Sequence, residues 1–341
     1  MLNPQENQDL SSRSREILDL LIADYIATSN PVGSRQIAKR IDNRLSPATI
    51  RNVLSDLEDS GFLAQPHTSA GRIPTEKGLR YYVDTLIERR PLSEEEENLI
   101  QNHYQVSGKD IRSLVTQTGK VLSEISKHVG LVLSPNWKST LFKHIEFLPL
   151  STHRILGIFV SQDGMVENRI LEIRESITAD DLEKINNYCN QNFTGLSLED
   201  AQQKIDRELQ KNRAEYDRLL SKALLFSREL FTGIDETELL LEPQGDKTME
   251  TVRNLLNSIE EKQQLRNLLR SCHESAGIQI FIGSESHCAG TEHLSLVTSN
   301  YRCKDRILGT VGIIGPRHMD YQRVIPMVDF TARLVSDFFE R

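Results

Sequence analysis

Ala48, Thr49, Arg51 and Asn52 form a group of neighbouring side chains that could read the bases of a nucleic acid. An arginine can pair bidentately with guanine and an asparagine with adenine, whereas alanine and threonine are small and can touch a thymine methyl group. In a helix that starts near residue 46, these side chains share one outward face close to its N-terminus. Small polar residues are also common on solvated helices, so this face alone leaves both interpretations open.

Basic side chains surround this face, and cations of this kind can hold phosphate oxygens. Residues 35–51 contain five Lys or Arg side chains and one Asp, an excess of four positive charges. A stripe this short also occurs on solvated helix faces, so it needs a fold around it to indicate a function. The side chains predicted to contact the DNA backbone, or to act from a wing, are Ser34, Arg35, Lys39, Arg40, Arg44, Ser46, His67, Thr68, Ser69, Arg72 and Lys77.

Three helices must position these residues. Apolar residues at helical spacing predict a first helix over residues 11–28 with Ser11 or Ser12 as its cap. Ser34 can cap a short second helix, and Ser46 followed by a proline opens a third helix that Gly61 ends. A tight turn between the last two helices predicts a helix-turn-helix, whose final helix can enter the major groove of DNA.

The segment after the third helix predicts a wing. Residues 62–66 have the pattern of a short strand, residues 67–72 form a polar turn, and residues 73–75 return before a helix that starts at Glu76. Donors at the tip of such a hairpin can hold phosphates or reach into a minor groove, with Lys77 and Arg80 behind them. Together, the helices, the wing and the basic stripe favour DNA binding.

Long unbroken motifs in this segment resemble a known family. Pro31-Val-Gly-Ser34, Leu45-Ser-Pro-Ala-Thr-Ile-Arg-Asn52 and Gln65-Pro-His-Thr-Ser-Ala-Gly-Arg72, followed by Pro74-Thr75, closely resemble the bacterial heat-inducible transcription repressor family, HrcA. The resemblance is strong over the first ~90 residues and looser towards the C-terminus. It implies a homodimeric repressor of chaperone operons that binds double-stranded DNA at an inverted-repeat operator called CIRCE and is kept active by a GroEL-type chaperonin.

Composition excludes several other classes of protein. A chain of 341 residues is long enough for two or three domains, and it has no apolar run long enough for a membrane helix. The polar, acidic N-terminus does not look like a signal peptide, and four cysteines without a CxxC pair fit a reduced, cytoplasmic protein. The net charge of −8 would by itself argue against nucleic acid, but residues 1–90 balance 12 cations against 12 acids.

The rest of the chain predicts a multidomain α+β protein. A helical pattern over residues 94–128, broken near 107–108, precedes strand patterns at 129–133, 142–150, 154–161 and 166–173 that predict an antiparallel meander. Helical stretches follow at 179–193, 198–231 and 247–272, and then come strands at 277–283, 294–301 and 306–314 and a closing helix at 321–339.

An insertion explains this order. The predicted division is a winged helix-turn-helix over 1–92, a GAF-like domain in two parts over 93–178 and 273–341, and an inserted, mainly helical domain over 179–272. The GAF-like and dimerising character of these parts comes from the family resemblance. By composition alone, the insertion could equally be a helical lobe that packs on its own monomer.

Catalytic and metal-binding chemistry finds little support. Gly283-Ser-Glu-Ser-His-Cys288 lacks the G-x-S-x-G elbow, and Gly309-Thr-Val-Gly-Ile-Ile-Gly315 is not a G-x-G-x-x-G loop and indicates a bulged strand. The spacings of Cys272-His273, His287-Cys288 and His293 match no zinc pattern. We therefore expect a protein that is not an enzyme and has no cofactor or metal. Two alternatives remain: a GAF-like regulator in which a small metabolite controls DNA binding, and an adaptor that uses the wing for protein contacts.

Overall fold

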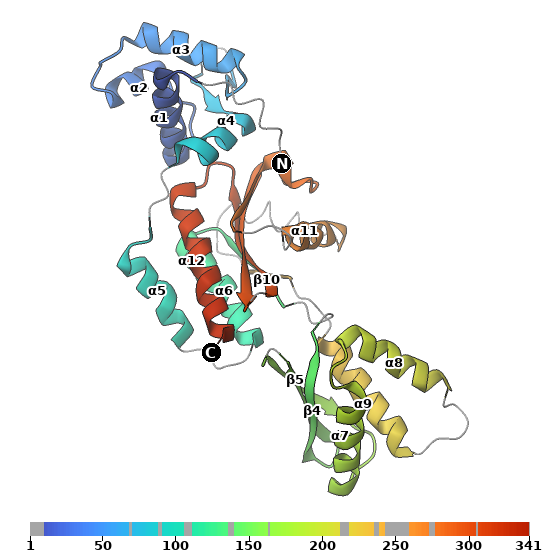
Figure 1. Ribbon diagram of the computed structural model, residues 1–341. Helices are drawn as coiled ribbons and strands as arrows, with labels where there is room; N and C mark the ends of the chain where they lie inside the picture. The colour runs from blue at the N-terminus through green and yellow to red at the C-terminus, as the bar shows by residue number, and fades with distance from the viewer. Residues whose placement is uncertain are drawn as a thin grey trace.

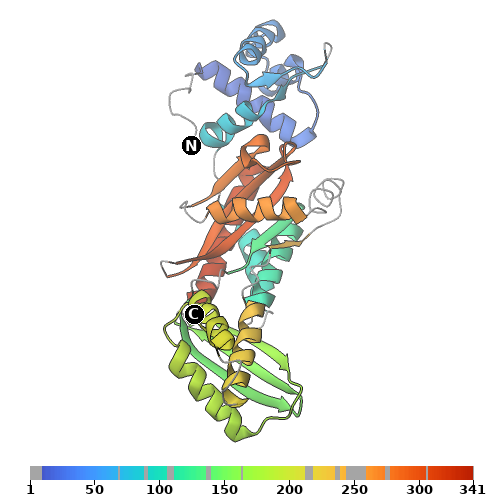
Figure 2. The same ribbon diagram turned by 90° about the vertical axis from the view of Figure 1, so that its right-hand side faces the viewer.

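The chain is elongated and consists of three bodies in a row in a computed structural model (Figures 1 and 2). The structure describes residues 10–67, 70–87, 91–105, 111–135, 140–162, 164–211, 218–234, 239–242, 259–272, 277–304 and 306–340. A helical head lies at one end, a five-stranded sheet in the middle and a three-stranded sheet at the other end. Among the described helices, none has the length and apolar composition needed to cross a membrane.

The head, residues 10–87, contains the three predicted helices: α1 (Ser12–Thr28), α2 (Ser34–Arg40) and α3 (Pro47–Asp59). Ser11 caps α1 through a hydrogen bond from the Ser14 backbone N–H, as predicted. The prediction that Ser34 caps α2 is wrong: Ser34 is the first residue of that helix, and Gly33 precedes it without a side-chain cap. This helix is short and packs on α1 and α3, so tertiary contacts stabilise it although it has no side-chain cap.

The wing is a small sheet. Strands β1 (Leu63–Ala64) and β2 (Ile73–Pro74) pair antiparallel, and Val32 adds a third segment through two backbone hydrogen bonds with Arg72, at 2.8 and 2.9 Å. A Cβ atom at Gly71 would lie 2.5 Å from the Val32 backbone, so this crossing requires glycine. After the wing, α4 (Glu76–Tyr81) continues into a π-helical turn, η2 (Tyr82–Leu86).

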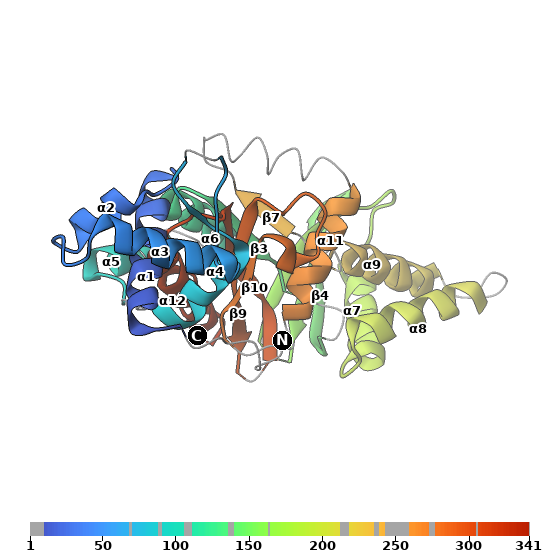
Figure 3. The same ribbon diagram turned by 90° about the horizontal axis from the view of Figure 1, so that it is seen from above.

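The central body is built on a five-stranded antiparallel sheet in the order β7-β3-β10-β9-β8. Helices α6 and α12 pack against one side of this sheet and α11 crosses the other, while α5 lies beside α6 and α12 (Figures 2 and 3). The strands are β3 (Val129–Leu133), β7 (Leu239–Glu242), β8 (Gln279–Ile282), β9 (Leu294–Cys303) and β10 (Arg306–Pro316). The helices are α5 (Glu94–Gln105), α6 (Ile111–Ser126), α11 (Ile259–Ser271) and α12 (Tyr321–Glu340).

The third body, which we call the lobe, is a separate three-stranded antiparallel sheet in the order β4-β5-β6. Its strands are β4 (Phe142–Ser151), β5 (Arg154–Ser161) and β6 (Val166–Glu172), and its helices are α7 (Ala179–Phe193), α8 (Leu198–Lys211) and α9 (Arg218–Ile234). The chain therefore does not divide at residue 178 as predicted. The meander packs with α7 and α9, and only β3 joins the central sheet.

The difference has a physical reason. All residues of β3 are buried, as expected in a sheet covered on both faces, whereas buried residues alternate with less buried ones along β5. The inner face of the lobe packs aromatic rings against α9, with ring centroids 4.8 Å apart for Phe142 and Phe231 and 5.9 Å apart for Phe147 and Phe226. The lobe thus has an apolar core of its own helices and strands.

The outer edge of the lobe sheet at β4 is covered by amide side chains of α7. Asn190 Oδ1 accepts from the Ile145 backbone N–H at 2.9 Å, and Asn186 Oδ1 accepts from the Phe147 N–H at 2.8 Å. The Asn190 amide donates back to the Ile145 carbonyl oxygen at 2.8 Å. These bonds satisfy backbone groups that an edge strand otherwise leaves open to another strand.

Candidate nucleic-acid interface

Helix α3 begins with the local chemistry that the sequence predicted. Ser46 Oγ accepts from the Thr49 backbone N–H at 3.1 Å and lies 2.9 Å from the Thr49 hydroxyl, and Pro47 occupies the first turn. On the inner side, Ile50, Leu54 and Leu57 are buried. The cap fixes the start of the helix, and the apolar stripe fixes its rotation, so both determine which side chains face outwards.

The outer face of α3 presents the predicted base-reading residues together. Ala48, Arg51, Asn52 and Ser55 are exposed, and Thr49 is half-buried beside the cap. In Figure 1, α3 lies at the far tip of the head, on the side away from the central sheet. Exposure at the tip leaves this stripe accessible to a long, rigid partner such as a DNA duplex.

The basic residues near α3 fall into two groups. Arg35 and Lys39 are exposed on α2. Arg40, in contrast, donates from Nε to Asp24 Oδ1 at 2.9 Å and forms an ion pair with the same oxygen at 2.7 Å. Arg44 pairs with Glu16 at 2.7 Å, although both of these side chains are largely exposed. Some of the residues predicted to bind phosphate therefore have acidic partners within the head.

The cations behind the wing also have partners in the head. Arg72 Nε lies 2.8 Å from Glu58 Oε2, and its side chain is only 18% exposed. This contact is an ion pair without an aligned hydrogen bond from Nε. Lys77 donates to the Ser60 carbonyl oxygen at 3.0 Å and lies 4.7 Å from the centroid of the Phe62 ring. Both side chains tie the wing and α4 to the end of α3.

The wing tip is described only in part. His67 is exposed, and its carbonyl oxygen accepts from the Ala70 N–H at 2.8 Å. The predicted contacts Thr68 and Ser69 lie outside the described residues. Ser34 is half-buried and Ser46 is exposed.

Asp24 is the residue that the sequence interpretation missed. It is 7% exposed, and besides Arg40 it accepts from Gln36 Nε2 at 3.1 Å, so it joins α2 to α1. A signal was present, since an acid at this position falls on the buried side of α1, three residues after Leu21. A buried carboxylate needs partners, and the basic stripe supplies one.

The other candidate chemistries were metal binding, a reactive cysteine and a glycine-rich loop. Within the described residues, no three His, Cys, Asp or Glu side chains are placed to hold a metal ion. Burial raises the pKa of the Cys288 thiol, which disfavours the reactive thiolate. The glycine-rich segment that ends at Gly315 is part of β10, with a bulge between Ile307 and Gly309, as its sequence indicated.

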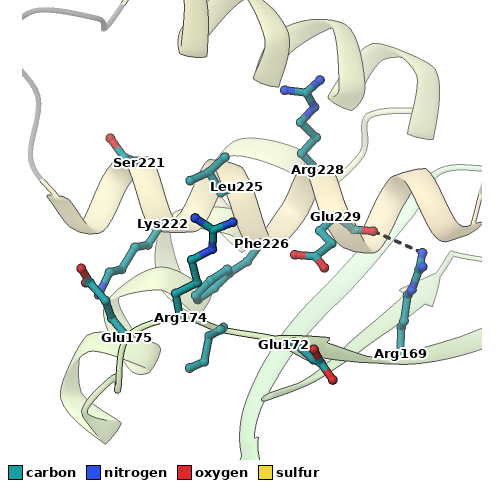
Figure 4. Close-up of a pocket in the computed structure, with 11 residues that line it drawn as sticks. Arg169, Glu172, Arg174, Glu175, Ser221, Lys222, Leu225, Phe226, Arg228 and Glu229 are labelled. Carbon is teal, nitrogen blue, oxygen red and sulfur yellow. Dashed lines mark hydrogen bonds and ion pairs between the residues drawn. The ribbon is translucent and has the colours of Figure 1, made fainter. Parts of the chain in front are cut away.

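Two hollows bear on the ligand-sensing alternative. A cavity between α11 and the central sheet has a volume of only about 20 Å³, enough for one water molecule. A larger groove of about 760 Å³ lies on the lobe, between α9 and the segment formed by β6 and the residues after it (Figure 4). Two of its cations have partners within the lobe: Lys222 pairs with Glu175 at 3.3 Å, and Arg169 donates to the Glu229 carbonyl oxygen at 3.4 Å.

The head is therefore a winged helix-turn-helix with an exposed final helix, the architecture of a DNA-binding protein. Comparisons with known proteins agree. Residues 9–83 match the model described as "Winged helix-turn-helix transcription repressor, HrcA DNA-binding", and residues 112–325 match that of the HrcA protein C-terminal domain. The chain belongs to the HrcA family of heat-inducible transcription repressors, as its motifs indicated.

Individual relatives match over nearly their whole length. The heat-inducible transcription repressor HrcA of Geobacter sulfurreducens is 41% identical over 339 residues, which cover 97% of this chain and 99% of that protein. The repressor of the same name from Syntrophobacter fumaroxidans is 38% identical, with 97% and 98% covered. A crystal structure of a hypothetical protein shares the fold, with a TM-score of 0.72 and 22% identity over 97% of this chain and 99% of that one.

Proposed function

We propose that this protein represses chaperone operons by binding, as a homodimer, an inverted-repeat operator of the CIRCE type, and that a GroEL-type chaperonin keeps it active. The observation that carries the DNA-binding part is the exposed stripe of α3, with Arg51 and Asn52 side by side at the tip of the molecule. The operator and the chaperonin are inferred from membership of the family.

The proposed roles of the residues follow their exposure. Ala48, Thr49, Arg51 and Asn52 face the bases, with Arg51 on guanine and Asn52 on adenine. Arg35 and Lys39 hold phosphates from α2. The remaining backbone and wing contacts are proposed to come from Ser34, Arg40, Arg44, Ser46, His67, Thr68, Ser69, Arg72 and Lys77. Arg40 and Arg72 would contact phosphate only with the part of each guanidinium that their acidic partners leave free.

The lobe supports the homodimer. The face of its sheet that points away from α7 and α9 is open and carries apolar side chains beside polar ones such as Glu146 and Asn168: Leu148, Val166 and Ile170 are 41%, 46% and 46% exposed. Leu156, half-buried, lies between Leu148 and Ile170 in one cross-strand row. A second copy related by a twofold axis would cover this face with an identical one, and an inverted repeat requires the same symmetry.

In this proposal, the lobe is the inserted dimerising domain and the central body is the GAF-like domain. In this proposal, heat unfolds the body of the repressor, and the chaperonin helps it to refold. The amount of active repressor therefore depends on how much chaperonin is free. An open apolar face on an unpaired chain is the kind of surface a chaperonin holds. If purified protein regains full operator binding after heating without any chaperonin, this part of the proposal fails.

DNase footprinting upstream of chaperone operons, with and without a GroEL-type chaperonin, tests the whole proposal. We expect a protected inverted repeat, and stronger protection when the chaperonin is present. A gel-shift titration in rising salt is the companion test, because phosphate contacts make the logarithm of the binding constant fall linearly with the logarithm of salt concentration. A flat response to salt would remove the DNA-binding function and favour an adaptor that uses the wing for protein contacts.

A further inference from the structure

Besides apolar and ring contacts, such as Tyr25 with His318, charged side chains join the head to the central body. On the head side, these side chains come from α4, the helix that follows the wing. On the body side, they come from the 3₁₀-helix η4 (Gly283–Ser286), which follows β8, and from the start of the segment that leads to α12. Partners about 200 residues apart in the chain therefore meet at one small interface.

Glu76 forms the first half of this contact. One carboxylate oxygen accepts from the Ser284 hydroxyl at 2.5 Å, and the other lies 3.2 Å from Arg317 Nη1. The Ser284 backbone N–H donates to the same carboxylate at 3.4 Å. A side chain at Gly283 would collide with this carboxylate, so the close approach depends on a glycine there. Glu76 is thus held by groups that all belong to the body.

Arg80, one turn later on α4, forms the second half. Its Nε donates to Glu285 Oε1 at 3.0 Å, and its Nη2 bonds the other Glu285 oxygen and donates to the Ile280 carbonyl oxygen at 2.6 Å. Burial acts to lower the pKa of Arg80, but the hydrogen bond and the charge of Glu285 outweigh it and raise that pKa. The fork of the guanidinium fixes direction as well as distance. Arg80 therefore acts at this interface, not behind the wing.

Helix α4 is rigidly connected to the DNA-reading helix. Thr75 Oγ1 caps α4 through the Gly78 N–H at 3.1 Å and also donates to the Gly61 carbonyl oxygen at 2.7 Å, just past the end of α3. A Cβ atom at Gly78 would collide with the Phe62 carbonyl oxygen, so the two segments lie in direct backbone contact. A rotation of α4 on the body would therefore carry α3 with it.

We propose that Glu76 and Arg80, with their partners Ser284, Glu285 and Arg317, are positioning residues that fix the angle of the head on the body. This inference rests on the proposed function, because in a dimer joined through the lobes the angle sets the distance between the two α3 helices. The interface then determines which half-site spacing the repressor accepts. Partly buried ion pairs suit this role, since they specify geometry more than they add stability.

The test is an operator series in which the spacer between half-sites changes by single base pairs, each of which rotates and shifts one half-site on the helix. The variant is Glu285→Gln with Arg317→Gln, which changes only the body and leaves the head sequence intact. Glu96→Gln is the matched control, because it removes an ion pair with Arg323, at 2.8 Å, that lies within the body.

We expect the wild-type protein and the control to bind one spacing much better than its neighbours. We expect the double variant to lose about tenfold affinity at that spacing and to bind neighbouring spacings nearly equally. Its affinity for a single isolated half-site should not change, since α3 is untouched. A double variant that keeps the sharp optimum of the wild type overturns the inference. If the wild type fails to bind even a single half-site, the proposed function fails instead. Glu76→Gln with Arg80→Gln repeats the test from the head side.

Discussion

The two ends of this molecule present opposite surfaces. At one end, the outer stripe of α3 carries Arg51 and Asn52 among small residues, over an apolar core. At the other, the open sheet face of the lobe carries Leu148, Val166 and Ile170, each more than 40% exposed. A polar, basic stripe suits a charged duplex, and an apolar sheet face suits another protein surface.

This contrast explains how an acidic chain can bind DNA. The net charge of −8 comes from residues 91–341, because residues 1–90 are balanced, and the DNA-reading face is a few side chains at one tip. Acidic groups farther away than a Debye length of about 8 Å are screened at physiological salt. In the proposed homodimer, the apolar end would contribute in another way, because joining two heads raises the effective concentration of each half-site contact.

The largest expected effect comes from breaking the apolar end. In Leu148→Asp with Ile170→Asp, charges replace the two side chains that flank Leu156 on the open face. The protein should then become monomeric and lose about 100-fold or more in affinity for the inverted repeat. Sedimentation velocity and gel shifts measure these two outcomes. Folding of the monomer should survive, since both side chains are already largely exposed.

Leu225→Asp is the matched control for that experiment. Leu225 is 51% exposed on α9 and lines the groove of Figure 4, on the side of the lobe away from the open face. It should leave the dimer intact. Dissociation by Leu225→Asp and not by the sheet variant would move the interface from the open face to the groove.

The next effect sharpens the polar end. Arg51→Ala should reduce the preference for operator over random DNA by about 1–3 kcal/mol, because a bidentate contact to guanine is lost, with little change in non-specific binding. Competition gel shifts measure both affinities. Arg333→Ala, on the exposed surface of α12, is the control and should change neither. Equal losses on operator and random DNA would make Arg51 a phosphate contact.

A smaller effect is expected at the start of α3. Ser46→Ala removes the cap to the Thr49 N–H and should cost about 1 kcal/mol of unfolding free energy, read from denaturant titration. Ser55→Ala, exposed on the same helix, should cost much less. Equal costs at both positions would show that the cap contributes little to this helix.

The smallest expected effect is a dependence of stability on pH that arises in the central body. It should change neither the DNA-reading face nor the open face of the lobe. Burial, and then the charge of His318, lower the pKa of His128 against the opposing charge of Asp320; burial and then Arg317 lower the pKa of His318. An unfolded histidine binds its proton near pH 6.5 and the folded ones only at lower pH, so stability is complete above about pH 6.5 and falls below it. The melting temperature should therefore drop between about pH 7 and 5.5, and less steeply in His128→Gln. An unchanged slope in that variant would assign the drop to other groups.

Local chemistry was predictable from the sequence. Ser46 and Pro47 predict the start of α3, and the helical spacing of its apolar residues predicts its buried face. Gly61, with a positive φ of 78°, follows the end of the helix. These features depend on residues within one or two turns of each other, and the motif resemblance to the family extended the same information. The predicted order of strands and helices held for the same reason, except that strand β7 (Leu239–Glu242) was not predicted.

Tertiary partners were not predictable. The spacing of the arginines along the chain does not show which of them form ion pairs. The structure pairs Arg40 with Asp24, Arg72 with Glu58 and Arg80 with Glu285. The sequence also did not predict that β4–β6 form a sheet of their own. A meander pattern does not indicate which helices will cover the strands. Only the burial pattern of a strand, continuous in β3 and alternating in β5, indicates which sheet the strand joins.

The amide side chains along β4 limit how many copies can assemble. Because Asn186 and Asn190 already bond the backbone of Ile145 and Phe147 on that edge, they disfavour the addition of a further strand there. The opposite edge, β6, carries Arg169 and Glu172, charges that discourage strand addition. If the proposed homodimer forms through the lobe, its association is therefore expected at the sheet face, which a single partner would cover. In the proposed homodimer, such edges would end growth at a pair and oppose polymerisation into fibrils.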